Sequence, residues 1–72
     1  MNKKEFCIKI GVKIRELRIE RNFSIQQFSD LLNIEYNNLI RIEKGRTNPT
    51  VSTLYKISQF LGIKLSEIVD VE

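Results

Sequence analysis

The sequence predicts an all-α fold in a single domain spanning residues 1–72. Three observations predict it. Apolar residues recur at intervals of three and four residues, no segment shows the strict alternation of a β-strand, and helix-start and helix-stop residues recur along the chain. A chain of 72 residues is long enough for one hydrophobic core and too short for two. We therefore expect a compact domain of five helices joined by short connections.

The composition excludes several classes of function. The chain has no His and one Cys, Cys7, so it can form neither a disulfide framework nor a zinc site of thiolates and imidazoles. A Ser–His catalytic pair is excluded for the same reason. The longest apolar run, residues 6–8, is far too short for a membrane span or a signal sequence. We expect a cytoplasmic protein without a metal, cofactor or small-molecule ligand, in which Cys7 is a small core residue.

The charge is unevenly distributed along the chain. Residues 1–56 carry 11 Lys or Arg against 6 Asp or Glu, whereas residues 57–72 carry one Lys against three acids. A basic body with a mildly acidic end favours a polyanionic partner that contacts the body. A net charge of +3 is also common among small solvated proteins, so charge alone leaves the partner open.

The first predicted helix carries an apolar face formed by Cys7, Ile10, Ile14 and Leu17. Lys9, Lys13, Glu16 and Glu20 fall on the other side. Gly11 interrupts this pattern at a cost of about 1 kcal/mol relative to Ala, which close packing would justify. The helix should end near Arg21 and Asn22.

The second helix has a clear start signal. Ser24 is placed as an N-cap, Gln27 completes a capping box, and Phe23 with Phe28 forms a hydrophobic staple. Asn33 can adopt the left-handed conformation that ends the helix. The expected buried face consists of Phe28, Leu31 and Leu32.

The third helix is expected from about Tyr36 to Lys44, where Gly45 stops it. Its inward residues are Leu39 and Ile42, preceded by Ile34. A loop from Arg46 to Pro49 follows.

The fourth helix begins after the cap residue Thr50 and ends at Gly62. A last short helix is expected from about Ser66 to Val69. The residues expected to face inward from the fourth helix are Val51, Leu54, Ile57, Phe60 and Leu61.

Residues 42–49 combine a helix end, a glycine stop and a proline-terminated loop in one unit, Ile-Glu-Lys-Gly-Arg-Thr-Asn-Pro. This unit closely resembles the phage-repressor and Cro-like (XRE) helix-turn-helix family. The other segments that carry the resemblance are Ile14-Arg15-Glu16-Leu17-Arg18, Phe23-Ser24, Phe28-Ser29, Leu39, Thr50, Ile57-Ser58, Leu61-Gly62-Ile63 and Leu65-Ser66-Glu67-Ile68. The resemblance covers about residues 8–70. It implies a lambda-repressor-like domain that regulates transcription by binding double-stranded DNA, and not an enzyme.

In this family the second helix crosses the DNA backbone and the third enters the major groove. Asn37 can bond adenine bidentately and Arg41 can bond guanine. Ile40, an apolar residue on the expected solvent side, favours contact with a partner over a merely solvated face. The expected base-reading residues are Tyr36, Asn37, Ile40 and Arg41.

Phosphate contacts are expected at both borders of this helix. Ser24 lies at a positive helix start, and the resemblance implies backbone contacts for Lys44, Arg46 and Asn48. The family commonly has Gln at the position of Ile25, so either Gln26 substitutes or that contact is absent. The third helix also lacks the usual Ser, Thr or Asp cap, because Glu35 stands there. The full set expected at phosphates is Ser24, Gln26, Lys44, Arg46, Thr47 and Asn48.

The resemblance also implies an ion pair between Arg18 and Glu43 that fixes the third helix on the first. Glu43 has no second acid, His or metal ligand with which to run a reaction, so we interpret it as structural.

The end of the chain is rich in apolar residues, and similar small repressors form two-fold dimers through this edge. The expected interface of a homodimer consists of Ile63, Leu65, Ile68 and Val69. The alternative is a helix that caps its own core with Leu65 and Ile68, leaving Val69 and Val71 loose.

The leading interpretation is a homodimeric regulator that binds an inverted-repeat operator, as Cro-like repressors, restriction–modification controller proteins and small immunity regulators do. The alternative is an antitoxin-like module that binds a protein and binds DNA only secondarily. Ile25, Tyr36 and Ile40 would then form the partner surface.

Overall fold

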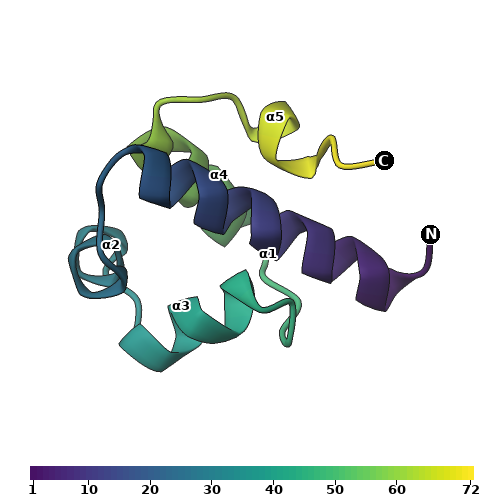
Figure 1. Ribbon diagram of the computed structural model, residues 1–72, viewed down its shortest axis with the longest axis horizontal. Helices are drawn as coiled ribbons and strands as arrows, with labels where there is room; N and C mark the ends of the chain where they lie inside the picture. The colour runs from purple at the N-terminus through teal and green to yellow at the C-terminus, as the bar shows by residue number, and fades with distance from the viewer.

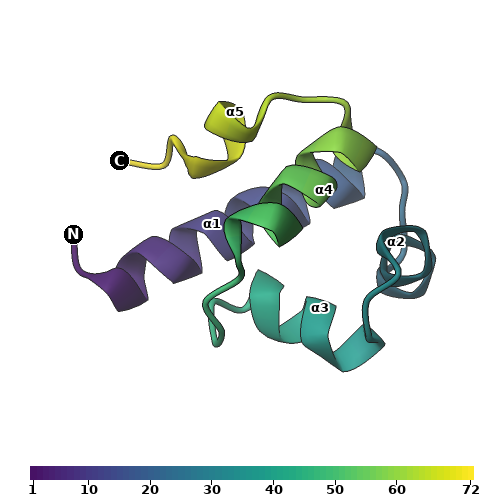
Figure 2. The same cartoon turned by 180° about the vertical axis from the view of Figure 1, so that it is seen from behind.

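The protein, described here by a computed structural model over residues 1–72, consists of five α-helices and contains no β-strand. The helix α1 crosses the middle of the molecule, α3 lies along one edge, α5 lies along the opposite edge, and α4 packs behind α1 (Figures 1 and 2). The predicted all-α class is thus confirmed. None of the helices is both long enough and apolar enough to cross a membrane. The helices are α1 (Lys3–Glu20), α2 (Ile25–Leu32), α3 (Tyr36–Glu43), α4 (Val51–Leu61) and α5 (Leu65–Val69).

The helix ends follow local capping chemistry. The Ser24 hydroxyl accepts the N–H of Gln27 at 3.0 Å, and the Gln27 side chain accepts the N–H of Ser24 at 2.9 Å. The rings of Phe23 and Phe28 stack with centroids 5.4 Å apart, and Asn33 adopts a left-handed conformation with φ 54°. The predicted capping box, staple and stop of α2 are all present.

The start of α1 was not anticipated from the sequence. The side chain of Asn2 accepts the backbone N–H of Glu5 at 2.9 Å and caps the helix at Lys3. The other end lies where the sequence predicts it, with Arg21 as the C-cap.

One core joins all five helices, and its membership corrects four expectations. Ile68 has no exposed surface, so it belongs to the core and cannot lie at a dimer interface. Val51 and Phe60 are 71% and 42% exposed, and Leu31 is 43% exposed, because the edge of an apolar stripe is buried only where another element covers it. The core residues are Ile10, Ile14, Phe28, Leu32, Leu39, Ile42, Leu54, Ile57, Leu61 and Ile68.

Gly11 is the point of closest approach between α1 and α3. A Cβ atom added there would lie 2.5 Å from the carbonyl oxygens of both Ile42 and Glu43. Only a residue without a side chain lets the last turn of α3 rest on α1. Gly45, with φ 70°, similarly lets the following loop approach the backbone of Ile8.

Candidate nucleic-acid interface

The outward face of α3 is a continuous polar surface. Tyr36, Asn37, Arg41 and Lys44 are exposed, whereas Leu39 and Ile42 on the opposite side are buried. This arrangement follows from the helical period, which separates the two sets by about half a turn.

Ile40 departs from the sequence-based expectation. Its side chain is half-buried and not fully on the solvent side. The argument that an exposed isoleucine needs a partner therefore applies only to the part of Ile40 that remains accessible beside Arg41.

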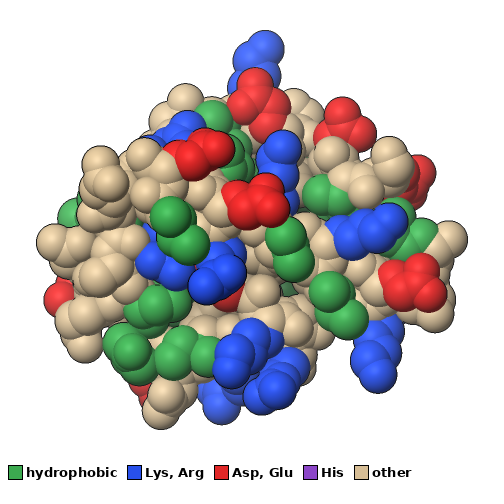
Figure 3. All heavy atoms as spheres, viewed as in Figure 1, with side chains coloured by type: hydrophobic (Ala, Val, Ile, Leu, Met, Phe, Trp, Pro, Cys, Tyr) green, Lys and Arg blue, Asp and Glu red, His purple; other side chains and the backbone are tan.

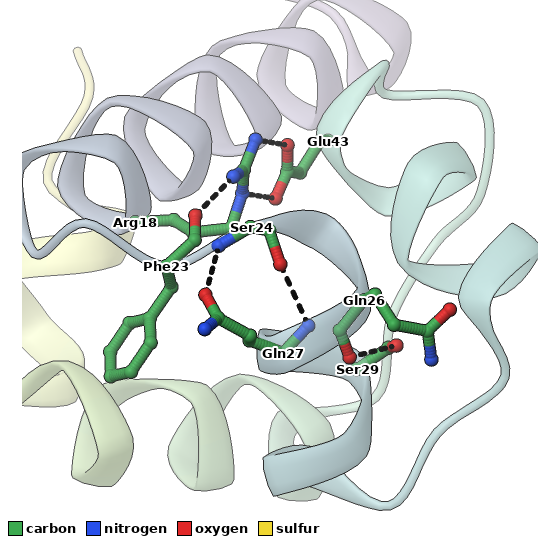
Figure 4. Close-up of polar contacts among 7 residues, drawn as sticks. All are labelled: Arg18, Phe23, Ser24, Gln26, Gln27, Ser29 and Glu43. Atoms are coloured by element: carbon green, nitrogen blue, oxygen red, sulfur yellow. Dashed lines mark hydrogen bonds and ion pairs between the residues drawn. The ribbon is translucent and has the colours of Figure 1, made fainter.

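A buried ion pair fixes α3 on α1 (Figure 4). Arg18 Nε donates to Glu43 Oε2 at 2.7 Å, and Arg18 Nη2 donates to Glu43 Oε1 at 3.1 Å. Arg18 Nη1 also donates to the carbonyl oxygen of Phe23 at 2.6 Å. The side chains are 8% and 3% exposed, and the chain contains no buried side-chain polar atom without a partner. One guanidinium thus connects α1, α3 and the residue before the α2 cap.

The start of α2 offers backbone donors to an anion. Because the capping box occupies the N–H groups of Ser24 and Gln27, the free N–H groups belong to Ile25 and Gln26. Ser24 is exposed and its hydroxyl can still donate. The side-chain amide of Gln26 donates to Asp30 at 2.9 Å on the surface, so it would exchange one exposed contact for another on meeting a phosphate.

The loop after α3 borders the other side of this face. Lys44, Arg46 and Asn48 are exposed, and Thr47 is half-buried. Arg46, Thr47 and Asn48 line an open hollow together with Lys3 and Lys4 from the first turn of α1. Sequence reasoning missed these two lysines, since their only signal is charge and their distance along the chain hides their proximity to the loop.

The surface charge agrees with this arrangement. Figure 3 shows Lys and Arg side chains gathered at the lower edge of the molecule, over α3 and the loop that follows it. A positive edge of this kind attracts a polyanion.

Ile25 and Glu35 are the two residues that depart from the family pattern, and their structural consequences differ. Ile25 is half-buried and packs partly against the core, so only part of its side chain is left for the partner surface that the protein-binding alternative requires. Glu35 is the N-cap of α3 but makes no side-chain cap hydrogen bond. The free carboxylate of Glu35 therefore stands at the border of the face that would meet DNA.

Two short helices, α2 and α3, are joined by a tight turn, and a buried ion pair fixes α3, whose outer face is basic. These features define a helix-turn-helix DNA-binding domain. Residues 14–68 match the model of the helix-turn-helix family HTH_3. The chain belongs to this family, whose characterised relatives are transcription regulators and not enzymes.

Two relatives and one solved structure illustrate the similarity. The transcriptional repressor RstR of the cryptic phage CTXphi in Vibrio cholerae is 32% identical, over 79% of this chain and 51% of its own length. The immunity repressor of Bacillus phage phi105 is 36% identical, over 88% of this chain and 44% of its own. The chain thus spans about half the length of these relatives. The fold also matches the restriction–modification controller protein C.AhdI from Aeromonas hydrophila with a TM-score of 0.82 and 24% identity, covering 86% and 94% of the two chains.

Proposed function

We propose that this protein regulates transcription in the cytoplasm by binding an inverted-repeat operator as a homodimer, with α3 of each copy in the major groove. The observation that carries the proposal is the outward face of α3, where exposed side chains suited to base edges lie on a helix held by a buried ion pair. A rigid helix places its side chains in one register against the bases, which specific recognition requires.

The face divides into base-reading and positioning parts. Asn37 matches the donor–acceptor edge of adenine, and Arg41 matches the two acceptors of guanine. Tyr36 and the accessible part of Ile40 offer apolar contact to thymine methyl groups. These four residues are the proposed base-reading set.

Phosphate contacts on both sides fix the register of the helix. At the start of α2 the donors are the N–H groups of Ile25 and Gln26, with the Ser24 hydroxyl and the Gln26 amide. Beyond α3 the proposed contacts are Lys44, Arg46, Thr47 and Asn48. One group precedes α3 in the chain and the other follows it, and we expect each to contact one of the two backbones that flank the groove.

We propose a homodimer because one domain can contact only a few base pairs. α3 has 8 residues, and few of them reach bases, so one copy specifies only a short half-site. Two copies related by a two-fold axis double that length, with half-sites about one DNA turn apart. Ile63, Leu65 and Val69 are only partly covered by their own core, so the edge at α5 retains apolar surface for this contact.

Selection of bound sequences from a pool of random duplexes tests this function. We expect enrichment of inverted repeats with half-site centres about 10 base pairs apart, and an affinity that falls steeply with salt as counterions are released. Enrichment of unrelated sequences, with weak and salt-insensitive binding, would contradict the proposal and favour the antitoxin-like alternative.

A further inference from the structure

The helix α1 is apolar on two sides. Its inner side supplies Ile10 and Ile14 to the core, yet Ile8, Val12 and Ile19 on the outer side are 39%, 47% and 49% exposed. With Arg15, these three residues follow a 4-3-4 spacing, which forms one continuous stripe on a helix. No other helix covers this stripe, because α4 packs against the other side of α1 (Figures 1 and 2). The loop at Gly45 contacts only its N-terminal end, at Ile8.

The charges beside the stripe have the same order at both ends of the helix. Towards the N-terminus lie Lys4 and Glu5, and towards the C-terminus lie Arg15 and Glu16, all exposed. Figure 3 views this side of the molecule and shows hydrophobic side chains along the line of α1, with both signs of charge beside them. The order basic–acidic is followed by the same order basic–acidic, so reversing the helix brings opposite charges together.

We propose that this face binds the same face of a second copy of the chain, with the two α1 helices antiparallel across a two-fold axis. When the pairing is centred at Ile10, Ile8 meets Val12 of the second copy and Glu5 meets Arg15. The two-fold axis repeats each contact, so one apolar and one ionic layer lie on each side of the centre. The interface is therefore self-complementary in both hydrophobicity and charge.

Other arrangements of two α1 helices lack this complementarity. A parallel pair would place Glu5 against Glu5 and Arg15 against Arg15. An antiparallel pair shifted so that Ile8 meets Ile19 would place Arg15 against Val12 and leave Glu5 opposite Asn22. Like charges or unpaired charges at a desolvated contact are unfavourable, so the stated register is the one that the sequence of the stripe fits.

The two charged residues that the test uses, Glu5 and Arg15, belong neither to the proposed DNA contacts nor to the edge at α5. In Figure 1, α1 crosses the middle of the molecule, α3 lies along its lower edge and α5 along its upper edge. The inference does not depend on whether the proposed operator function is correct.

Exchanging the two ionic partners tests the register. Glu5→Arg creates like-charged contacts with Arg15, and Arg15→Glu creates like-charged contacts with Glu5. We expect each variant alone to self-associate about tenfold more weakly, since two attractive pairs become repulsive. An equimolar mixture of the two variants restores both pairs between unlike chains, and the double variant E5R/R15E restores them within a homodimer, with the composition and net charge of the wild type.

Sedimentation equilibrium of the free protein, up to high micromolar concentration, measures the outcome, with circular dichroism to verify that every variant is folded. The proposed association through α5 would be the same in all samples, so only the differences between samples report on α1. We expect the mixture and the double variant to match the wild type and to exceed either single variant. Equal average masses in all samples, or a mixture no larger than its components, would overturn the proposal.

Discussion

At the scale of single residues, the ion pair between Arg18 and Glu43 couples stability to function. Two buried charges satisfy each other, and the carbonyl oxygen of Phe23 takes a further guanidinium donor. A buried pair contributes modestly in net terms because both charges lose hydration, but removing one partner leaves the other uncompensated. The pair therefore fixes the position of α3 on α1, although its net contribution to the free energy of unfolding is modest.

Glu43→Ala should therefore lower the free energy of unfolding by about 3 kcal/mol, since Arg18 remains buried without its anion. Denaturant titration measures this change. Glu20→Ala is the matched control, because the Glu20 carboxylate lies 3.6 Å from Arg21 and its side chain is 68% exposed, so little change is expected. If Glu43→Ala unfolded at the same denaturant concentration as the wild type, the buried pair would not be what holds α3.

At the scale of elements, helix ends proved more predictable than helix faces. Ser24, Asn33 and Gly62 act through hydrogen bonds and backbone angles within a few residues, so the sequence contains the whole cause. Burial depends on which element covers a given stripe. Periodicity therefore misplaced the exposed Val51, and the likeness to dimeric repressors misplaced the fully buried Ile68.

The contact between α1 and α3 gives a test at this scale. Gly11→Ala gains about 1 kcal/mol of helix propensity, but its Cβ would meet two backbone oxygens of α3. We expect a net loss of about 2 kcal/mol as the helices move apart. Unfolding of this variant is best compared with that of Glu16→Ala, an Ala substitution at an exposed position of the same helix. A Gly11→Ala variant as stable as the wild type would refute the close approach.

At the scale of the whole molecule, the candidate interface combines three segments that are distant in sequence. The resemblance supplied the residues of α2, α3 and the following loop. It did not supply Lys3 and Lys4, which reach the loop only because α1 runs beneath α3. The buried Ser29 and Ser58 were also missed. Their hydroxyls donate to the carbonyl oxygens of Gln26 and Tyr55, and such local bonds hide polar residues inside an apolar core.

The central claim is that the outward face of α3 reads bases while the loop beyond it holds phosphates. Fluorescence anisotropy on operator and scrambled duplexes, at several salt concentrations, separates the two roles. Arg46→Ala should weaken binding to both duplexes alike and lower the log–log salt slope by about one unit per contact, hence about two in a homodimer.

The most direct test is the ratio of operator to scrambled affinity for Arg41→Ala, with Arg46→Ala as the matched control for loss of one positive charge. We predict that Arg41→Ala loses about 1–3 kcal/mol on the operator, relaxes the preference at one base pair of each half-site, and so lowers the ratio. Arg46→Ala should leave the ratio unchanged. An unchanged ratio for Arg41→Ala would contradict the account and make Arg41 a phosphate contact.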